Sequence, residues 1–306
     1  MACSKVIHLF TILLGLAIIR VHGHISRSYP KHAYHARNLN TIQSIYNRTV
    51  YPTNLVFLAN GSASVPAGLF NENATGRITP VGNFSGFEDS VEYFFALAPA
   101  ARPPTYAAFV KAEIVEFVSE CPEVAASTVY FRTQSVHPGA PDDGRYITTL
   151  KQIAFWRFDS TGAVQYYDAW IPSLNLFTAK ITNATILTPA YEAAAIQSLC
   201  GATQALCTGG NTQYASIGDC VATLSARAFG EYDEIWGDNV VCRTIRVLLA
   251  RIRPDVHCPH VGPTGGGKCV DADYNDVYFD DQALFGQPEG ETFVCPSGTL
   301  DRERRL

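Results

Sequence analysis

The chain has 306 residues, of which 47% are hydrophobic and 17% charged, and its formal net charge is −5 at pH 7. This apolar content is enough to bury one large core or two smaller ones. The charge is spread along the chain without a basic stripe, which argues against a nucleic-acid partner.

Residues 1–23 have the order of a secretory signal peptide. Lys5 precedes an apolar run from Val6 to Ile19, and Gly23 places a small residue at the expected cleavage point. The run ends too early to cross a bilayer, which takes about 20 apolar residues. We therefore expect a secreted, extracellular protein with no membrane attachment after cleavage. Residues 24–37 are expected to form a flexible N-terminal segment and residues 299–306 a charged tail.

Eight cysteines remain after the signal peptide, and an even number in a secreted chain indicates disulfides. Seven of them lie between residues 200 and 295. If all are oxidised within one molecule, Cys121 must pair with a cysteine of this second region, although the partner is left open. The eight are Cys121, Cys200, Cys207, Cys220, Cys242, Cys258, Cys269 and Cys295.

Five Asn-x-Ser/Thr sequons fit the same compartment, because this motif is the acceptor for N-glycosylation in secreted proteins. We expect the five asparagines to lie on the surface and to be glycosylated. They are Asn47, Asn60, Asn73, Asn83 and Asn183.

Residues 38–182 combine helical and strand patterns. Apolar residues recur at helical spacing from Phe87 to Ala98, behind a capping box formed by Ser85 and Glu88. Four later segments are rich in β-branched and aromatic residues, as strands are. Helices followed by a run of long strands indicate an α+β fold with an antiparallel sheet. The four segments are Tyr106–Phe117, Thr128–Gln134, Ile147–Phe158 and Ala163–Ile171.

Four motifs stand out in this region: GLFNENATGR at residues 68–77, the Gly86-Phe87 helix start, AFWRFD at 154–159 and YDAW at 167–170. Together they resemble the SnoaL-like branch of the nuclear transport factor 2-like superfamily. The resemblance implies a cone of helices on a curved antiparallel sheet around an apolar cavity. Enzymes of this family need no metal or organic cofactor, and use a carboxylate or a histidine as general acid or base. The whole chain is also similar to secreted proteins of filamentous fungi that carry a C-terminal Cys-rich module.

Asp168 is the best candidate for such a catalytic base. Val164, Tyr166, Asp168 and Trp170 share one face of a strand, and a carboxylate among aromatic carbons loses hydration, so its pKa rises. Alternatively, this face is exposed to solvent or Asp168 pairs with Arg157. The expected pocket walls are Tyr93, Trp156, Tyr166 and Trp170, although Tyr93 and Trp156 could instead be core residues.

Residues 188–298 are expected to form a Cys-rich, mainly helical module. Helices are predicted over Pro189–Leu199 with Thr188 as its N-cap, over Ile217–Ala228, and over Val240–Ile252 after Asp238 or Asn239. Arg243 and Arg246 lie off the apolar face of the last helix.

Residues 253–269 follow, and within them the stretch from Gly262 to Lys268 matches most of a phosphate-binding loop. Cys269 stands where that motif needs a magnesium-binding hydroxyl, so the match fails. A metal site through His257, Cys258 and His260, and an anion site at Lys268, remain open beside a simple Gly/Pro-rich connection between two cysteines.

The leading hypothesis is therefore a secreted protein with a pocket for a small apolar molecule. The pocket would serve either binding or a cofactor-free lyase, isomerase or cyclase reaction with Asp168 as base. The alternative is a non-enzymatic extracellular binding or interaction protein, and a lesser one is a metal-binding protein that uses His257 and His260.

Overall fold

The computed structural model describes residues 33–277 and 280–295. The expected signal peptide, most of the expected flexible segment and the charged tail lie outside these residues. Residues 33–37, which we expected to be flexible, belong to the first helix, α1 (Ala33–Thr49). None of the described helices is long and apolar enough to cross a membrane.

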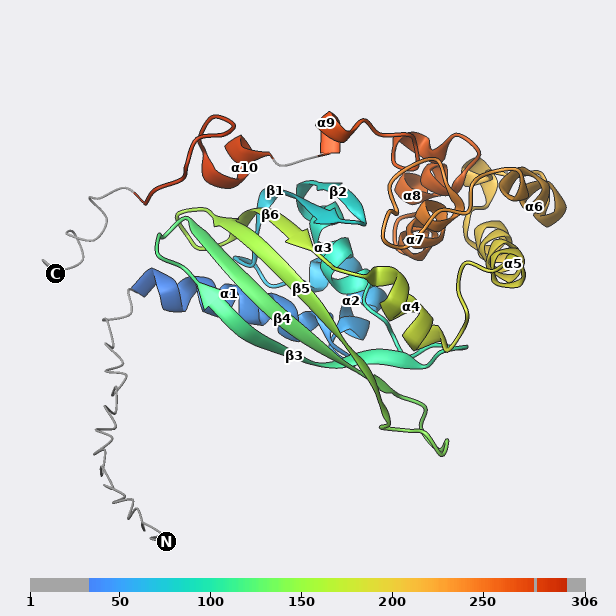
Figure 1. Ribbon diagram of the computed structural model, residues 1–306, viewed down its shortest axis with the longest axis horizontal. Helices are drawn as coiled ribbons and strands as arrows, with labels where there is room; N and C mark the ends of the chain where they lie inside the picture. Colours follow the sequence, from blue (N-terminus) through green and yellow to red (C-terminus); the bar gives the residue numbers. More distant parts are fainter. Residues whose placement is uncertain (1–32, 278–279, 296–306) are drawn as a thin grey trace, which may run out of the picture. The chain divides into compact units, whose positions relative to one another are not determined.

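The structure is built on a six-stranded sheet with the order β2-β1-β6-β5-β4-β3 (Figure 1). The α+β class predicted from the sequence is confirmed. The sheet is mixed rather than antiparallel throughout, because β1 and β6 pair in parallel. The strands are β1 (Phe70–Thr79), β2 (Gly82–Ser85), β3 (Ala107–Val118), β4 (Val124–Ser135), β5 (Tyr146–Phe158) and β6 (Val164–Trp170).

The parallel pair depends on a close approach between the two strands. Gly76 lies opposite Tyr167 in the register, and a Cβ atom at Gly76 would overlap the Tyr167 ring. The glycine therefore lets the ring lie over β1 and reach helix α3 (Gly86–Ala96), where the Tyr167 hydroxyl donates to Ser90 Oγ at 3.1 Å.

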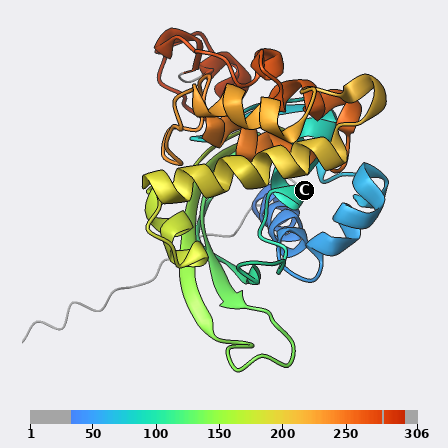
Figure 2. The same ribbon diagram turned by 90° about the vertical axis from the view of Figure 1, so that its right-hand side faces the viewer.

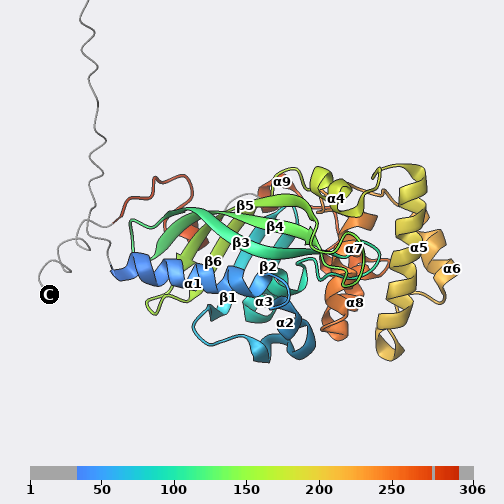
Figure 3. The same ribbon diagram turned by 90° about the horizontal axis from the view of Figure 1, so that it is seen from below.

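Helix α1 runs along the sheet, with α2 (Asn54–Asn60) and α3 nearby (Figure 3). It buries Ile42, Ile45 and Tyr46 completely, which are spaced at one face of a helix. The capping box expected at α3 does not form, because the Ser85 side chain makes no cap bond and Glu88 accepts from Ser62 Oγ at 2.8 Å instead. A short 3₁₀ helix, Gly61–Ser64, follows α2.

The C-terminal half is helical, as predicted, and Figure 2 shows its longest helix, α5, in full length. The predicted N-cap Thr188 is confirmed, since it accepts from the Tyr191 amide, and of the two candidates before α7 it is Asn239 that accepts from the Cys242 amide. The helices are α4 (Leu174–Thr182), α5 (Pro189–Leu206), α6 (Ile217–Ser225), α7 (Val240–Ala250), α8 (Pro254–Val261), α9 (Tyr274–Val277) and α10 (Asp281–Phe285), with 3₁₀ turns at Gly209–Asn211 and Gly265–Gly267.

All eight cysteines after the expected signal peptide form disulfides, and the pairing of Cys121 with the second region is confirmed. Its partner is Cys295, which fixes the segment after α10 to the turn between β3 and β4. Three bridges hold the helical half together: Cys200–Cys220, Cys207–Cys258 and Cys242–Cys269. Four disulfides fit an oxidising compartment.

The helical half contributes to the main core as well as to a core of its own. Tyr232, Ile235, Val241 and Leu249 pack in one cluster with apolar residues of the sheet and of α3. Each fully buried aliphatic side chain contributes about 1.5–3 kcal/mol, so the two halves stabilise one another.

The sequon asparagines all lie on the exposed surface, and glycosylation at them remains a prediction that the structure permits. They are Asn47, Asn60, Asn73, Asn83 and Asn183.

Candidate ligand cavity and buried polar network

An apolar cavity of about 430 Å³ opens beside the sheet. Side chains from α3, the strands β3 to β5, and the helices α4 and α7 line it, so both halves of the chain contribute. Its volume falls in the range of small-molecule sites, which are mostly apolar with a few placed polar groups. Examples of its lining are Phe94, Phe109, Phe131, Leu150, Phe177 and Ile245.

Two polar side chains, Tyr93 and Gln152, lie in the inner wall. The Tyr93 hydroxyl donates to Gln152 Oε1 at 3.3 Å. Burial raises the pKa of Tyr93 well above its ordinary value, so the hydroxyl stays neutral and can donate. Gln152 is 3% exposed, and its amide nitrogen has no hydrogen-bond partner within the described chain.

The charged side chains in the described lining are Arg102, between α3 and β3, and Arg251, at the C-terminus of α7. No aspartate, glutamate, histidine, lysine or cysteine is among the described residues that line the cavity. The cavity wall therefore offers hydrogen-bond donors and positive charge, but no carboxylate or imidazole to act as a base.

Of the residues expected from the sequence to form the site, Tyr93 lines the cavity. Asp168, Trp156, Tyr166 and Trp170 do not. Successive side chains of a strand point to opposite faces, and Tyr167 faces α3, so its neighbours on β6 face away. Trp156 is fully buried in the core, where its Nε1 donates to Ser127 Oγ at 2.9 Å.

Asp168 forms a buried ion pair with Arg77 of β1, with Arg77 Nη2 2.9 Å from Asp168 Oδ2. The parallel register places the two residues opposite one another. Burial raises the pKa of Asp168, and Arg77 lowers it only in part. Arg157, the expected partner, instead donates to the carbonyls of Gln282 and Ala283.

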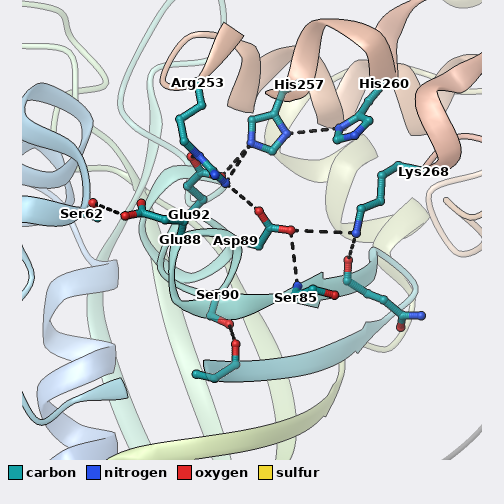
Figure 4. A network of polar contacts seen from close by, with 12 residues as sticks. Ser62, Ser85, Glu88, Asp89, Ser90, Glu92, Arg253, His257, His260 and Lys268 are labelled. Atoms are coloured by element: carbon teal, nitrogen blue, oxygen red, sulfur yellow. Dashed lines mark hydrogen bonds and ion pairs between the residues drawn. The ribbon is translucent and has the colours of Figure 1, made fainter. Parts of the chain in front are cut away.

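A second polar site joins α3 to α8 (Figure 4). Glu92, which is fully buried, accepts from Arg253 Nε at 2.5 Å and Nη2 at 2.6 Å. His257 Nε2 lies 2.8 Å from the same carboxylate. Arg253 also bonds Asp89 Oδ1 at 2.6 Å, and His257 Nδ1 lies 3.3 Å from His260 Nδ1. We call Asp89, Glu92, Arg253, His257 and His260 the α3–α8 network.

The α3–α8 network has the donor atoms of a metal site, but it lacks the uncompensated negative charge that would attract a cation. Asp89, Glu92 and His257 each offer one ligand atom, within 4.8 Å of one another. Arg253 already pairs with both carboxylates, Arg246 acts on both, and Lys268 acts on Asp89, so their negative charge is balanced within the protein. A divalent cation would have to displace these charges, so the geometry favours a structural role.

The segment thought to be a loop around His257 is partly helical, because α8 includes His257, Cys258 and His260. Lys268, the candidate anion ligand, donates to the Asn83 carbonyl at 3.0 Å and lies 4.0 Å from Asp89. The sequence alone does not predict the roles of Asp89, Glu92 and Arg253, because their partners come from distant parts of the chain.

The fold and the cavity together define an α+β protein with a pocket of small-molecule size. The chain belongs to the BfoA family: the BfoA N-terminal domain matches residues 43–169, and the BfoA family C-terminal domain matches residues 164–272. The two matches meet within β6.

Two curated relatives come from Aspergillus. The bifonsecin B biosynthesis cluster protein A of Aspergillus brasiliensis is 27% identical over 242 residues, which is 74% of this chain and 77% of that protein. The aurasperone B biosynthesis cluster protein A of Aspergillus niger is 26% identical over 242 residues, covering 74% of this chain and 75% of that protein.

Solved structures are similar to about half of the chain. A protein named as a SnoaL-like polyketide cyclase, from Jannaschia sp. CCS1, has a TM-score of 0.34 and 10% identity, covering 50% of this chain and 97% of that one. A steroid delta-isomerase from Pseudomonas aeruginosa has a TM-score of 0.31 and 15% identity, covering 51% and 94%.

Proposed function

We propose that the protein binds a small, largely apolar aromatic molecule in this cavity and serves in the biosynthesis of a fungal secondary metabolite. The observation that carries the proposal is the cavity itself, with its apolar wall and the Tyr93–Gln152 pair inside it. The names of the two Aspergillus relatives, which are biosynthesis cluster proteins, support the proposed role in secondary-metabolite biosynthesis. The four disulfides support secretion.

Binding is favoured over acid–base catalysis by the composition of the wall. A general base must come within hydrogen-bond reach of the proton that it removes, and the described lining contains no carboxylate or imidazole. A lyase, isomerase or cyclase with Asp168 as base remains a prediction, and it would need a substrate on the opposite face of the sheet. Conversion of a bound compound by the wild type but not by Asp168→Asn would support it.

Binding can be measured on the purified, disulfide-bonded protein with bifonsecin B, aurasperone B and a panel of three-ring aromatic compounds. A ligand at about 100 times its Kd raises the free energy of unfolding by about 2.7 kcal/mol, which a thermal shift detects. Elemental analysis of the same preparation tests the metal-binding alternative.

A matched pair of variants on α4 places the ligand. Leu174 lines the cavity, whereas Leu176 on the same helix is 73% exposed and does not. Leu174→Trp should weaken binding at least about tenfold by filling the cavity, and Leu176→Trp should leave it unchanged. Equal binding by the two variants, or no shift with any compound, would contradict the proposal.

A further inference from the structure

Two groups of polar side chains in the cavity lining differ in their exposure to solvent. Gln152 lies at the inner wall and is 3% exposed. Arg102 and Arg251 also line the cavity, but both are exposed to solvent. A ligand that fills the cavity thus meets a neutral hydrogen-bond donor at its inner end and two positive charges at its outer end.

The two rim arginines differ from the other arginines of the described chain. Within residues 33–277 and 280–295, neither Arg102 nor Arg251 has a side-chain hydrogen bond or an ion pair. Each of the other described arginines bonds a carboxylate or a carbonyl. This is notable in a protein whose formal net charge is −5, because carboxylates are available but none lines the cavity.

The inner wall has a buried donor that no well-formed hydrogen bond satisfies. Gln152 Oε1 accepts from the Tyr93 hydroxyl, and the amide nitrogen forms no hydrogen bond within the described chain, although the Tyr46 hydroxyl interacts with the Gln152 side chain. An unbonded buried donor is costly to stability, and an oxygen acceptor on a ligand, such as a ring carbonyl or hydroxyl, would satisfy it.

We infer that the ligand is an aromatic acid that is ionised at neutral pH. Its anionic group is bound by Arg102 and Arg251 at the rim, its rings fill the apolar middle, and an oxygen acceptor reaches Gln152. A guanidinium suits this role because its planar set of donors matches a carboxylate and it remains charged at any physiological pH. This inference rests on the proposed function and adds the class of ligand to it.

The test compares a fluorescent acid with its neutral ester, 2-anthracenecarboxylic acid and its methyl ester, in titrations of the full disulfide-bonded protein. The acid should bind about tenfold or more tightly than the ester, and its affinity should fall as salt is added. Arg102→Met and Arg251→Met should each weaken the acid several-fold, and the double variant about tenfold or more, while the ester changes less than about twofold.

Arg145→Met is the matched control, because Arg145 is an exposed arginine in the segment between β4 and β5 and does not line the cavity. It should bind both compounds as the wild type does. If the acid binds no better than the ester, or the double variant binds the acid unchanged, the inference is overturned and the proposed function stands. If neither compound nor any neutral aromatic binds, both are overturned.

Discussion

Glu92 Oε2 lies 2.8 Å from His257 Nε2, although 165 residues separate the two in the sequence. Glu92 belongs to α3, which packs on the sheet, and His257 to α8 of the helical half. Since Arg253 precedes α8 and bonds both Glu92 and Asp89, the α3–α8 network fixes the second half of the chain against the first.

Glu92→Gln should destabilise the protein strongly. The substitution keeps the shape of the side chain but removes the charge that balances Arg253. Removing one partner of a buried ion pair typically costs about 3–5 kcal/mol. Denaturant unfolding at pH 7 would measure the loss.

Glu113→Gln is the control for this change, because Glu113 pairs with Lys111 and Arg132 at the exposed surface of β3 and β4. Exposed ion pairs contribute little to the free energy of unfolding, so Glu113→Gln should not change it measurably. Similar losses in the two variants would contradict a structural role for the α3–α8 network.

His260 should make the protein less stable as the pH falls below about 6.5. Burial, with a smaller effect of His257, Arg246 and Lys268, lowers the pKa of His260 from 6.5 to about 3, while Asp89 acts in the opposite direction. The unfolded chain therefore binds a proton between these pH values that the folded chain does not, so the free energy of unfolding decreases, by about 2 kcal/mol at pH 5.

His260→Asn should flatten this dependence between pH 7 and 5. The carboxyls of Asp89 and Glu92 do not interfere in this window. Burial alone would raise their pKa values, but the hydrogen bonds from Arg253 outweigh it and lower them, so stability from these groups is lost only as the pH falls below about 4.5. Parallel curves for variant and wild type would show that His260 is not the group that titrates.

Removing the Cys121–Cys295 disulfide should release the segment that includes α10. The bridge joins residues 174 apart, and the loss of such a crosslink typically costs about 2–5 kcal/mol. In the Cys121→Ser/Cys295→Ser variant we expect glutamyl endopeptidase to cut after Glu289 and Glu291 faster than in the wild type, as followed by mass spectrometry. Cleavage at the wild-type rate would show that other contacts, such as Arg157 to the Gln282 carbonyl, are sufficient to hold it.

The sequence predicts the parts of this structure that depend on local or countable features. The strands β3 to β6 can be predicted from their β-branched and aromatic residues, and the starts of α5 and α7 from the capping residues Thr188 and Asn239. The odd number of cysteines in the second region predicts that Cys121 pairs with one of them. The parallel pairing of β1 with β6 joins residues such as Gly76 and Tyr167 that no local pattern connects.

The cavity could be predicted only in part, because it depends on how distant segments meet. Tyr93 was expected there, but Gln152, Arg102 and Arg251 were not, because β5, the segment before β3 and the end of α7 come together only in the folded chain. Similarly, Arg243 was expected off the apolar face of α7, yet it is fully buried and bonds the carbonyls of Asn239 and Gly262. Gly262 comes from the segment after α8, and hydrophobic periodicity does not reveal this contact.

Tyr93 and Gln152 should show a conflict between stability and binding. Tyr93→Phe removes the hydrogen bond that Gln152 Oε1 accepts and leaves Tyr46 as a polar neighbour of this buried side chain, which should cost about 1–2 kcal/mol of unfolding free energy. Adding Gln152→Leu replaces both polar groups with apolar ones, so the double variant should return to wild-type stability or exceed it, yet bind ligand more weakly. Tyr146→Phe, an exposed tyrosine, is the control for the first step. A double variant that is no more stable than Tyr93→Phe, or that binds as the wild type does, would show that Gln152 is not held in place for a ligand.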